Sequence, residues 1–542
     1  MGLLVLILLS CLVALLGGLY VLGVFRKQRP GEPPLDKGLI PWLGHVLEFR
    51  RDTFKFLERM RQKHGDVFTV QLGGFYFTFL QDPFSFGAFV KESREKLDFN
   101  SFAEQLVYRV FGYKAVENDH HVLHNASNKH LKGEEQLVYR VFGYKAVDND
   151  HHVLHNASNK HLKGEGLEVM TQAMMSNLQN LMLHSVGSAT DQSPWKEDGL
   201  FMYSYNIVFR AGFLALFGNV PHKSEGGEEK AKEKDRTHSE TLFYEFRKYD
   251  QLFPNLAYGV LPPKQKWEAD RLQSYFWDAV SVQNMKAKDN ISRWVWDMQQ
   301  AKEEVGMDES MINKYMFVLL WASQGNTGPS SFWLLLFLLK HPEAMKAVRE
   351  EVDKVLKETG QTVTRGGPLV DLTREMLMKT PVLDSAVEET LRLTAAPLLT
   401  RAVLQDMTLK MADGRQYFIR KGDRMSIFPY SAVHLDPEIH PEPHAFKYDR
   451  FLNPDGSRKT EFYKGGKKVK YYNMPWGAGV SMCPGRFFAT NELKQFVFLM
   501  LVYFEFELKN PNEEIPDIDF RRWGFGSMQP IRDVQFRYRL RF

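Results

Sequence analysis

The residue most suited to chemistry is Cys483, one of two cysteines in a chain of 542 residues. It lies in the segment PWGAGVSMCPGR, residues 475–486, with glycine on both sides of the thiol. Glycines allow the backbone to approach a flat ligand and to turn amide N–H groups toward a sulfur anion. An isolated cysteine is usually a small buried hydrophobe. The glycine-rich frame instead favours a thiolate that binds a metal such as iron.

A second group of residues combines one carboxylate with two guanidinium groups. Glu389 and Arg392 stand three residues apart on one face of a predicted helix, and Arg450 follows in the segment FKYDRF. A pair at this spacing is usually a surface ion pair worth about 0.3–0.5 kcal/mol. Because a guanidinium binds a carboxylate through two parallel hydrogen bonds, we predict that the three residues form a buried network.

A third feature is an uncharged run at 315–339, whose middle is SQGNTGPSS. The length of the run would allow a membrane span, but its polar middle would need partners that lipid does not supply. We therefore predict a long core helix with a weakened waist. Such a waist opens the ladder of helical hydrogen bonds and offers hydroxyl and backbone groups to a bound ligand. Asn326 and Thr327 stand at this waist.

A mainly helical body is expected to position these residues. Apolar residues recur at helical spacing over 170–183 and 380–393. Strand patterns are short and few, at 67–72, 76–80 and 534–538. The predicted fold class is mainly α with small β sheets.

Composition excludes several classes of protein. Hydrophobic residues make up 44% and charged residues 25%, as in globular proteins and unlike disordered or collagen-like chains. Seventy Lys and Arg residues nearly balance 66 Asp and Glu residues, so no nucleic-acid partner is expected. Two cysteines exclude a disulfide framework and a cysteine-rich zinc site. The charge-dense stretch 224–236 is expected to be a solvated loop.

The amino terminus predicts a membrane anchor. Residues 2–25 carry no charge, and as a helix they would reach about 36 Å, enough to cross a hydrocarbon core of ~30 Å. A cleaved signal peptide is the alternative, but its apolar region is shorter and its positive charges come first. Here basic residues follow the run, which places the rest of the chain in the cytosol. The predicted boundaries are 1–25 for the transmembrane anchor, 26–41 for a proline-rich linker and 42–542 for the catalytic domain.

The chain also contains a near-perfect tandem repeat. Residues 104–134 recur as 135–165, with Glu117 against Asp148 as the single difference. Two copies are too few for a solenoid, and their near identity indicates a recent duplication or a gene-model error. One copy is expected to occupy the original place in the fold, and the sequence does not identify which.

Each copy of the repeat carries a histidine cluster, His120-His121-x-x-His124 in the first and His151-His152-x-x-His155 in the second. This spacing is compatible with a metal site on one face of a helix. No glutamate stands between the histidines as in zinc proteases, so an ordinary helix face is favoured.

Four motifs follow one another along the chain: the waist helix, the Glu-x-x-Arg pair, the segment FKYDRF and the cysteine loop. Their order resembles the cytochrome P450 superfamily of heme-thiolate monooxygenases. The resemblance covers essentially the whole chain after the apolar amino terminus. It implies the cytochrome P450 fold with an N-terminal transmembrane helix, and heme b (iron protoporphyrin IX) between the waist helix and the cysteine loop. Cys483 would be the axial ligand of the heme iron. Glu389, Arg392 and Arg450 would be structural.

Two departures from the family pattern concern the site. The cysteine loop begins with Trp476 instead of phenylalanine, and Ser481 replaces the arginine that would bind a heme propionate. Arg401 is the predicted substitute. The usual acid–threonine pair of the waist is Asn326-Thr327. We predict both as catalytic residues, since Thr327 would donate a hydrogen bond to dioxygen and Asn326 would order a water.

Longer strings, among them ASQGN at 322–326 and FKYDRFLNP at 446–454, are similar to the group that contains sterol 12α-hydroxylases and prostacyclin synthases. Retention of Thr327 favours hydroxylation, because isomerising an endoperoxide needs no delivered protons. The resemblance therefore implies hydroxylation of a 7α-hydroxylated sterol at the 12α position, in bile acid biosynthesis. A prostacyclin-synthase-like isomerase and a non-functional product of the duplication are the alternatives.

The same resemblance implies the partners. These are the sterol, O2, NADPH-cytochrome reductase as electron donor and the endoplasmic reticulum membrane, with a single span and a cytosolic catalytic domain. Segments 394–400 and 523–529 would line the sterol pocket. The reductase is expected on a basic face, although a lysine cluster is more often a solubilising surface. The candidate residues for that face are Lys464, Lys467, Lys468 and Lys470.

Overall fold

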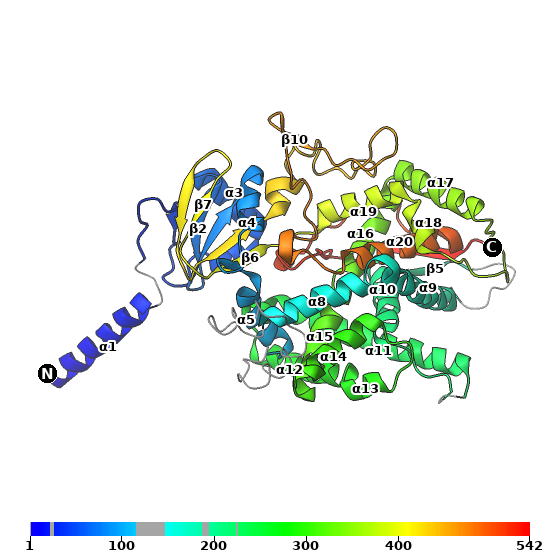
Figure 1. Cartoon of the computed structure of the whole chain (residues 1–542), viewed down its shortest axis with the longest axis horizontal. Coiled ribbons are helices and arrows are strands. Elements are labelled where there is room, and N and C mark those ends of the chain that lie inside the picture. The colour runs from blue at the N-terminus through cyan, green and yellow to red at the C-terminus, as the bar shows by residue number, and fades with distance from the viewer. Residues whose placement is uncertain (1, 22–25, 115–146, 187–193, 224–225) are drawn as a thin grey trace, which may run out of the picture.

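Helices make up most of the chain and strands form small sheets, as the apolar periodicities predict (Figure 1). The computed structural model describes residues 2–21, 26–114, 147–186, 194–223 and 226–542. A large helical lobe lies beside a smaller β-rich lobe, and α1 projects away from both (Figure 1). The helices are α1 (Gly2–Val21), α2 (Val46–Arg51), α3 (Thr53–His64), α4 (Phe86–Val90), α5 (Phe99–Phe111), α8 (Val147–His161), α9 (Gly164–Val186), α10 (Leu200–Phe217), α11 (Glu228–Tyr258), α12 (Pro263–Ala279), α13 (Val282–Lys286), α14 (Arg293–Glu304), α15 (Glu309–Gln324), α16 (Thr327–Lys340), α17 (Pro342–Glu358), α18 (Arg374–Met378), α19 (Pro381–Thr394) and α20 (Arg486–Tyr503).

The main sheet has six strands in the order β1-β2-β3-β9-β6-β4. Strands β2 and β3, at the predicted strand positions 67–72 and 76–80, pair as a hairpin whose turn is Gly73-Gly74, both with positive φ, the conformation that tight hairpin turns require. A second sheet orders β12-β13-β5, and two hairpins complete the set. The strands are β1 (Leu35–Asp36), β2 (Val67–Leu72), β3 (Phe75–Leu80), β4 (Leu97–Asp98), β5 (Lys196–Gly199), β6 (Leu399–Val403), β7 (Met407–Lys410), β8 (Gln416–Ile419), β9 (Arg424–Ile427), β10 (Tyr463–Lys464), β11 (Lys467–Lys468), β12 (Phe504–Leu508) and β13 (Gln535–Leu540).

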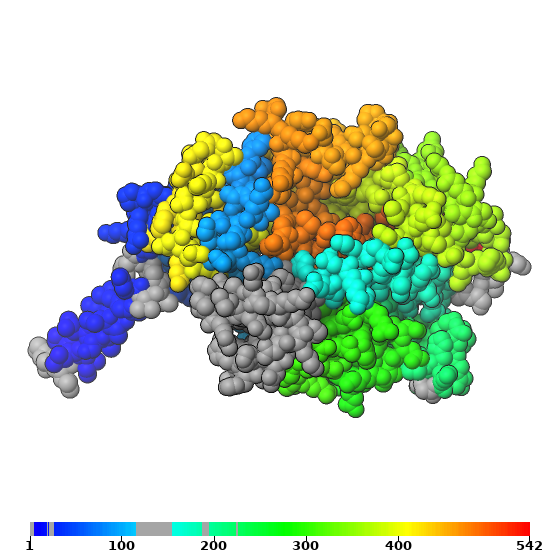
Figure 2. Space-filling view, in the orientation of Figure 1, coloured from blue at the N-terminus to red at the C-terminus, as the bar shows by residue number. Residues whose placement is uncertain are grey.

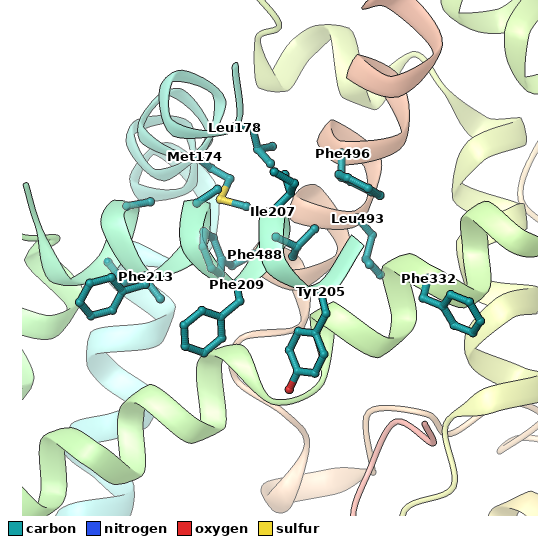
Figure 3. Packing of buried hydrophobic residues seen from close by; sticks show 14 of the residues in the cluster. Met174, Leu178, Tyr205, Ile207, Phe209, Phe213, Phe332, Phe488, Leu493 and Phe496 are labelled. Atoms are coloured by element: carbon teal, nitrogen blue, oxygen red, sulfur yellow. The ribbon is translucent and has the colours of Figure 1, made fainter. Parts of the chain in front are cut away.

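Helix α10 forms the centre of the helical lobe. It is apolar on nearly every face and buried along its whole length, as expected for a helix surrounded by others. Its aromatic side chains Tyr205, Phe209 and Phe213 point to one side of the helix, where their rings contact Phe243, Phe246 and His238 of α11, whereas α9 and α20 pack on the other side (Figure 3). Burying each such ring stabilises the fold by roughly 1.5–3 kcal/mol.

The prediction of one long core helix is wrong, because the weakened waist is a complete break between two helices. Helix α15 ends at Gln324 and α16 begins at Thr327, so the run 315–339 is not one continuous helix. The break lies against α10, where Tyr205 donates a hydrogen bond to the carbonyl oxygen of Gly325 at 3.4 Å. A Cβ atom on Gly328 would lie 1.8 Å from the Tyr205 ring, so only glycine permits this approach.

The prediction of a solvated loop at 224–236 is wrong for most of that stretch. From Glu228 onward it is the first part of α11. Lys and Glu are good helix formers, and Lys232 pairs with Glu228 one turn away. Ala231 and Asp235 are buried, and Asp235 accepts hydrogen bonds from Val220 N–H and the Asn219 side chain. A high density of charge therefore marked the outer face of a helix and not a loop.

The apolar amino terminus forms α1, whose described side chains are exposed. Its apolar stretch Val5–Gly18 is short for a bilayer span. Among the described residues, α10 is the one helix that is long and apolar enough to cross a membrane, and it is buried in the helical lobe. The predicted linker contacts the body: Arg26 pairs with Asp423, and Glu32 pairs with Arg420.

The fold takes its elements from both copies of the repeat. Residues 104–111 of the first copy complete α5, and the second copy supplies α8 and the start of α9. Helix α5 therefore begins in the unrepeated residues before the first copy, and α9 continues into the unrepeated residues after the second copy. His151, His152 and His155 fall on helix α8, whereas the histidines of the first copy lie outside the described residues. The described residues contain no group of three or more His, Cys, Asp or Glu that would hold a metal ion.

We expect deletion of residues 115–145 to preserve the fold. The deletion joins residues 104–114 to 146–165, which together make one copy of the repeat. Both parts pack beside α14: Lys302 donates to the Tyr113 hydroxyl just after α5, and His161 at the end of α8 pairs with Asp297. Shortening a connection of 32 residues to one should stabilise the protein by up to about 3 kcal/mol, at ~0.6 kcal/mol for each halving of length. Urea unfolding of both proteins measures the difference. A deletion variant that is less stable than the full chain would contradict this expectation.

Candidate active site

The loop around Cys483 is held by short backbone contacts. The Cys483 N–H donates to the carbonyl oxygen of Trp476 at 2.8 Å, which closes the loop. Gly477 and Gly479 have φ of +74° and +65°, a region that favours glycine. A Cβ atom on Gly479 would also lie 2.8 Å from the carbonyl oxygen of Val90, so the loop packs directly on the end of α4. The predicted helical run after the loop is α20.

The surroundings of the Cys483 sulfur favour a bound thiolate. Burial raises the pKa of the thiol, while N–H groups of Gly485 and Arg486 donate to the sulfur and oppose that rise. Donors at the start of a helix stabilise negative charge. A bound metal cation would stabilise the thiolate further, because a thiol that coordinates a metal loses its proton.

Arg401 lies on β6 next to the cysteine loop and is buried. Its Nη1 donates to the carbonyl oxygen of Phe89 at 2.7 Å, and its guanidinium stacks on the Phe89 ring. A small cavity separates Arg401 from Ser481 and is also lined by Arg94 and Asp98. Burial, and next the charge of Arg94, lower the pKa of Arg401. Two guanidinium groups against one carboxylate leave a positive site that favours a further anion.

The predicted carboxylate–guanidinium network is confirmed. Arg392 donates to both Glu389 oxygens at 2.7 and 2.8 Å, and Arg450 Nε lies 2.9 Å from each of them. Arg392 also donates to the carbonyl oxygens of His434 and Pro443. All three charged side chains are buried. The network therefore ties α19 to the irregular segment that leads toward the cysteine loop.

At the waist, the two predicted catalytic residues point in different directions. The Asn326 Oδ1 atom accepts a hydrogen bond from Ser527 N–H at 2.9 Å, which joins the break to the segment 523–529. The Thr327 hydroxyl is buried and faces the carboxyl group of Glu492 on α20. A hydroxyl at a helix break is free of the helical ladder and available to donate.

The whole body of the chain matches one protein family. Residues 33–536 match the family model described as Cytochrome P450. The chain is a cytochrome P450. It is 50% identical to the human 7-alpha-hydroxycholest-4-en-3-one 12-alpha-hydroxylase, over 98% of this chain and 97% of that protein. It is 49% identical to the Sus scrofa 5-beta-cholestane-3-alpha,7-alpha-diol 12-alpha-hydroxylase, with the same coverage of both chains.

Two further relatives place this P450 more broadly. Human prostacyclin synthase is 43% identical over 95% of each chain. The solved structure of retinoic acid-bound cyanobacterial CYP120A1 superposes with a TM-score of 0.64 at 20% identity, covering 95% of this chain and all of that one. The fold is therefore the mainly helical P450 fold with small sheets, as predicted.

Membership of this family implies a heme-thiolate cofactor, and the residues of this P450 fit it. The amide donors at the Cys483 sulfur suit a ligand thiolate. The cavity between Arg401 and Ser481 lies where the family's arginine is missing, and its excess positive charge suits a carboxylate such as a heme propionate. Arg94 was not predicted, because its position beside Arg401 depends on the pairing of β4 with β6.

The structure brings the two predicted pocket segments together. Residues 394–400 and 523–529 run side by side, with Ala396 N–H donating to Gly526 O at 2.9 Å and Met528 N–H donating to Thr394 O at 2.8 Å. The same segment 523–529 contacts Asn326 at the waist, and Leu399 contacts the cysteine loop at Gly477. These contacts link Asn326, the two predicted pocket segments and the cysteine loop in one continuous series, whereas Thr327 faces Glu492.

Glu492 is a buried residue that sequence reasoning missed. It is fully buried on α20 beside the Thr327 hydroxyl, and a Cβ atom on Gly212 would lie 2.7 Å from its Oε1. Burial raises the pKa of this carboxyl well above its usual range, and the hydrogen bond with Thr327 opposes that rise. Glu492 is the one acid in α20, and this was the available signal.

The predicted lysine face forms an exposed hairpin. Strands β10 and β11 pair across Gly465 and Gly466, and the hairpin stands out from the body at the top of the view in Figure 2. Lys464 pairs with Asp436, and Lys468 pairs with Glu461. These two pairs reduce the positive charge that the hairpin presents.

Proposed function

We propose that this P450 hydroxylates a 7α-hydroxylated sterol at the 12α position, a step of bile acid biosynthesis, at the endoplasmic reticulum membrane. Identity of about half of all residues with two 12α-hydroxylases, over nearly the whole chain, carries the proposal. The projecting helix α1 supports an anchor at 1–25, followed by a linker at 26–41 and a cytosolic catalytic domain at 42–542.

Bound heme supplies the oxidising chemistry, in which one atom of O2 enters a C–H bond and the other leaves as water after two electrons and two protons are taken up. In this proposal Cys483 holds the iron and Arg401, with Arg94, holds the propionates. Thr327 presents a proton through its hydroxyl, and Asn326 holds the waist against the pocket segment and orders water. NADPH-cytochrome reductase supplies the electrons through the lysine face.

The test uses the full chain in membranes with reductase, NADPH and 7α-hydroxycholest-4-en-3-one, and identifies the product by mass spectrometry and NMR. We expect one added hydroxyl group at the 12α position. The identity with prostacyclin synthase favours a second candidate, an endoperoxide isomerase. Turnover of an endoperoxide without NADPH or reductase, together with no sterol product, would establish that alternative. A purified protein without the Soret band of a reduced, CO-bound heme thiolate would indicate a non-functional product of the duplication.

We expect Thr327→Ala to lower the sterol product formed per NADPH consumed by about tenfold to a hundredfold, because a positioned proton donor contributes at least that much. Thr327→Ser retains the hydroxyl and should keep most of the coupling. Product and NADPH are measured in the same reaction, so enzyme content cancels. Equal coupling in Thr327→Ala and the wild type would contradict the role of the hydroxyl.

A further inference from the structure

A buried ion cluster joins α11 to the carboxyl-terminal pocket segment. Asp250, on α11, has no exposed surface. Its Oδ1 accepts from Arg522 Nη2 at 2.8 Å, and its Oδ2 accepts from Arg247 Nη1 and Gln529 Nε2, both at 2.7 Å. Arg522 immediately precedes the 523–529 segment, and Gln529 is its last residue. One carboxylate therefore holds both ends of that segment.

Stability alone does not explain this cluster. Removing two guanidinium groups and a carboxylate from water costs several kcal/mol per ion, and apolar residues of similar volume often stabilise a fold equally well. Burial acts to raise the pKa of Asp250, but Arg522 and Arg247 hold it below its usual value, so the carboxylate remains charged. Unlike apolar contacts, the hydrogen bonds of an ionic cluster require one geometry, so they fix the orientation of the elements that they join.

The opposite side of the segment is held by one face of α16. Asn326 accepts from Ser527 N–H, the hydroxyl groups of Ser330 and Ser527 lie 2.9 Å apart, and Trp333 Nε1 donates to Met528 O at 2.8 Å. Positions 326, 330 and 333 share a helix face. The segment is therefore clamped between α11 and α16, with directional bonds on both sides.

We propose that Asp250, Arg522 and Gln529 are positioning residues that hold the 523–529 segment as a rigid wall of the substrate pocket. A sterol is rigid and mostly apolar, and apolar contacts have no direction. The positions of the pocket walls then decide which sterol carbon reacts. A displacement of the substrate by about 1 Å is enough to lower the rate. This inference rests on the proposed function for the sterol, and on the contacts above for the clamp itself.

The test compares two clamp variants with a matched control in the full-length holoenzyme. Gln529→Leu removes the hydrogen bonds of Gln529 to Asp250 and Arg247, while the two buried charges still pair with each other, and Asp250→Asn removes the central charge. Glu513→Gln is the control, since it removes a carboxylate that pairs with Arg532 at the surface of the same carboxyl-terminal region. Hydrogen exchange at the Ser527 and Met528 amides, the ratio of hydroxysterol products and thermal unfolding are measured for each.

We expect Gln529→Leu to speed exchange at these two amides about tenfold, relative to core amides of α10, and to lower the ratio of main to minor products at least about tenfold. Glu513→Gln should change neither quantity. Unchanged local exchange and an unchanged product ratio in Gln529→Leu would overturn the clamp, whatever happens to Asp250→Asn. If the wild type leaves the sterol unchanged, the proposed function fails, and local exchange alone then decides whether the clamp exists.

Discussion

Cys483→Ser should abolish the heme-thiolate band of the reduced, CO-bound protein and lower turnover at least about a thousandfold, which corresponds to roughly 4 kcal/mol of lost transition-state stabilisation. The serine hydroxyl has no accessible anion at neutral pH, so the amide donors of Gly485 and Arg486 would face a neutral oxygen. The measurement is the CO difference spectrum followed by single-turnover product formation.

Cys11→Ser is the matched control, because Cys11 is the other free cysteine and lies exposed on α1. It should retain both the spectrum and the activity. Cys483→Ser protein that kept the wild-type band and rate would show that the iron is held elsewhere, and the site described above would then be wrong.

Glu389→Gln should destabilise the protein by about 3–5 kcal/mol, because it leaves two buried guanidinium groups without their shared carboxylate. The side chains of Glu389 and Arg392 have no exposed surface, so water cannot replace the lost partner. Urea unfolding measures the loss of stability, and the CO difference spectrum shows whether heme is still held.

Glu388→Gln tests the same chemistry one position away. Glu388 pairs with Arg458 at 2.8 Å, and the exposed fractions of the two side chains are 21% and 64%, so water reaches this pair. An exposed pair of this kind contributes about 1 kcal/mol or less. Equal losses of stability in the two variants would mean that burial does not strengthen the dependence on Glu389.

Features with local physical causes were predictable. The hairpin β2–β3 follows from β-branched and aromatic residues on both sides of two glycines. The break between α15 and α16 follows from the small and polar residues of the waist. The cysteine loop followed by α20 is also a continuous piece of chain. In each case the residues that decide the structure are neighbours in sequence.

Other features depended on which elements meet. The stretch 224–236 looks like a loop because its charges are visible in the sequence, whereas the burial of Ala231 and Asp235 within the packed body is not. Glu492 and Asp250 are ordinary acids in sequence, and only the packing of distant elements around them makes them buried groups. The repeat is a further example. Its two copies are almost identical and have the same local preferences, so local sequence does not tell which copy forms which helix.

The amino-acid order was therefore sufficient for the family, its heme-thiolate cofactor and the helical class, because these rest on motifs and periodicities that extend over a few turns or one strand. Tertiary structure decided that residues of the first repeat copy complete α5 and residues of the second form α8, that Arg94 stands beside Arg401, and that the segment 523–529 is held from two sides. The physical reason is distance along the chain. Contacts such as that between Asp250 and Arg522, 272 residues apart, exist only after the core has packed.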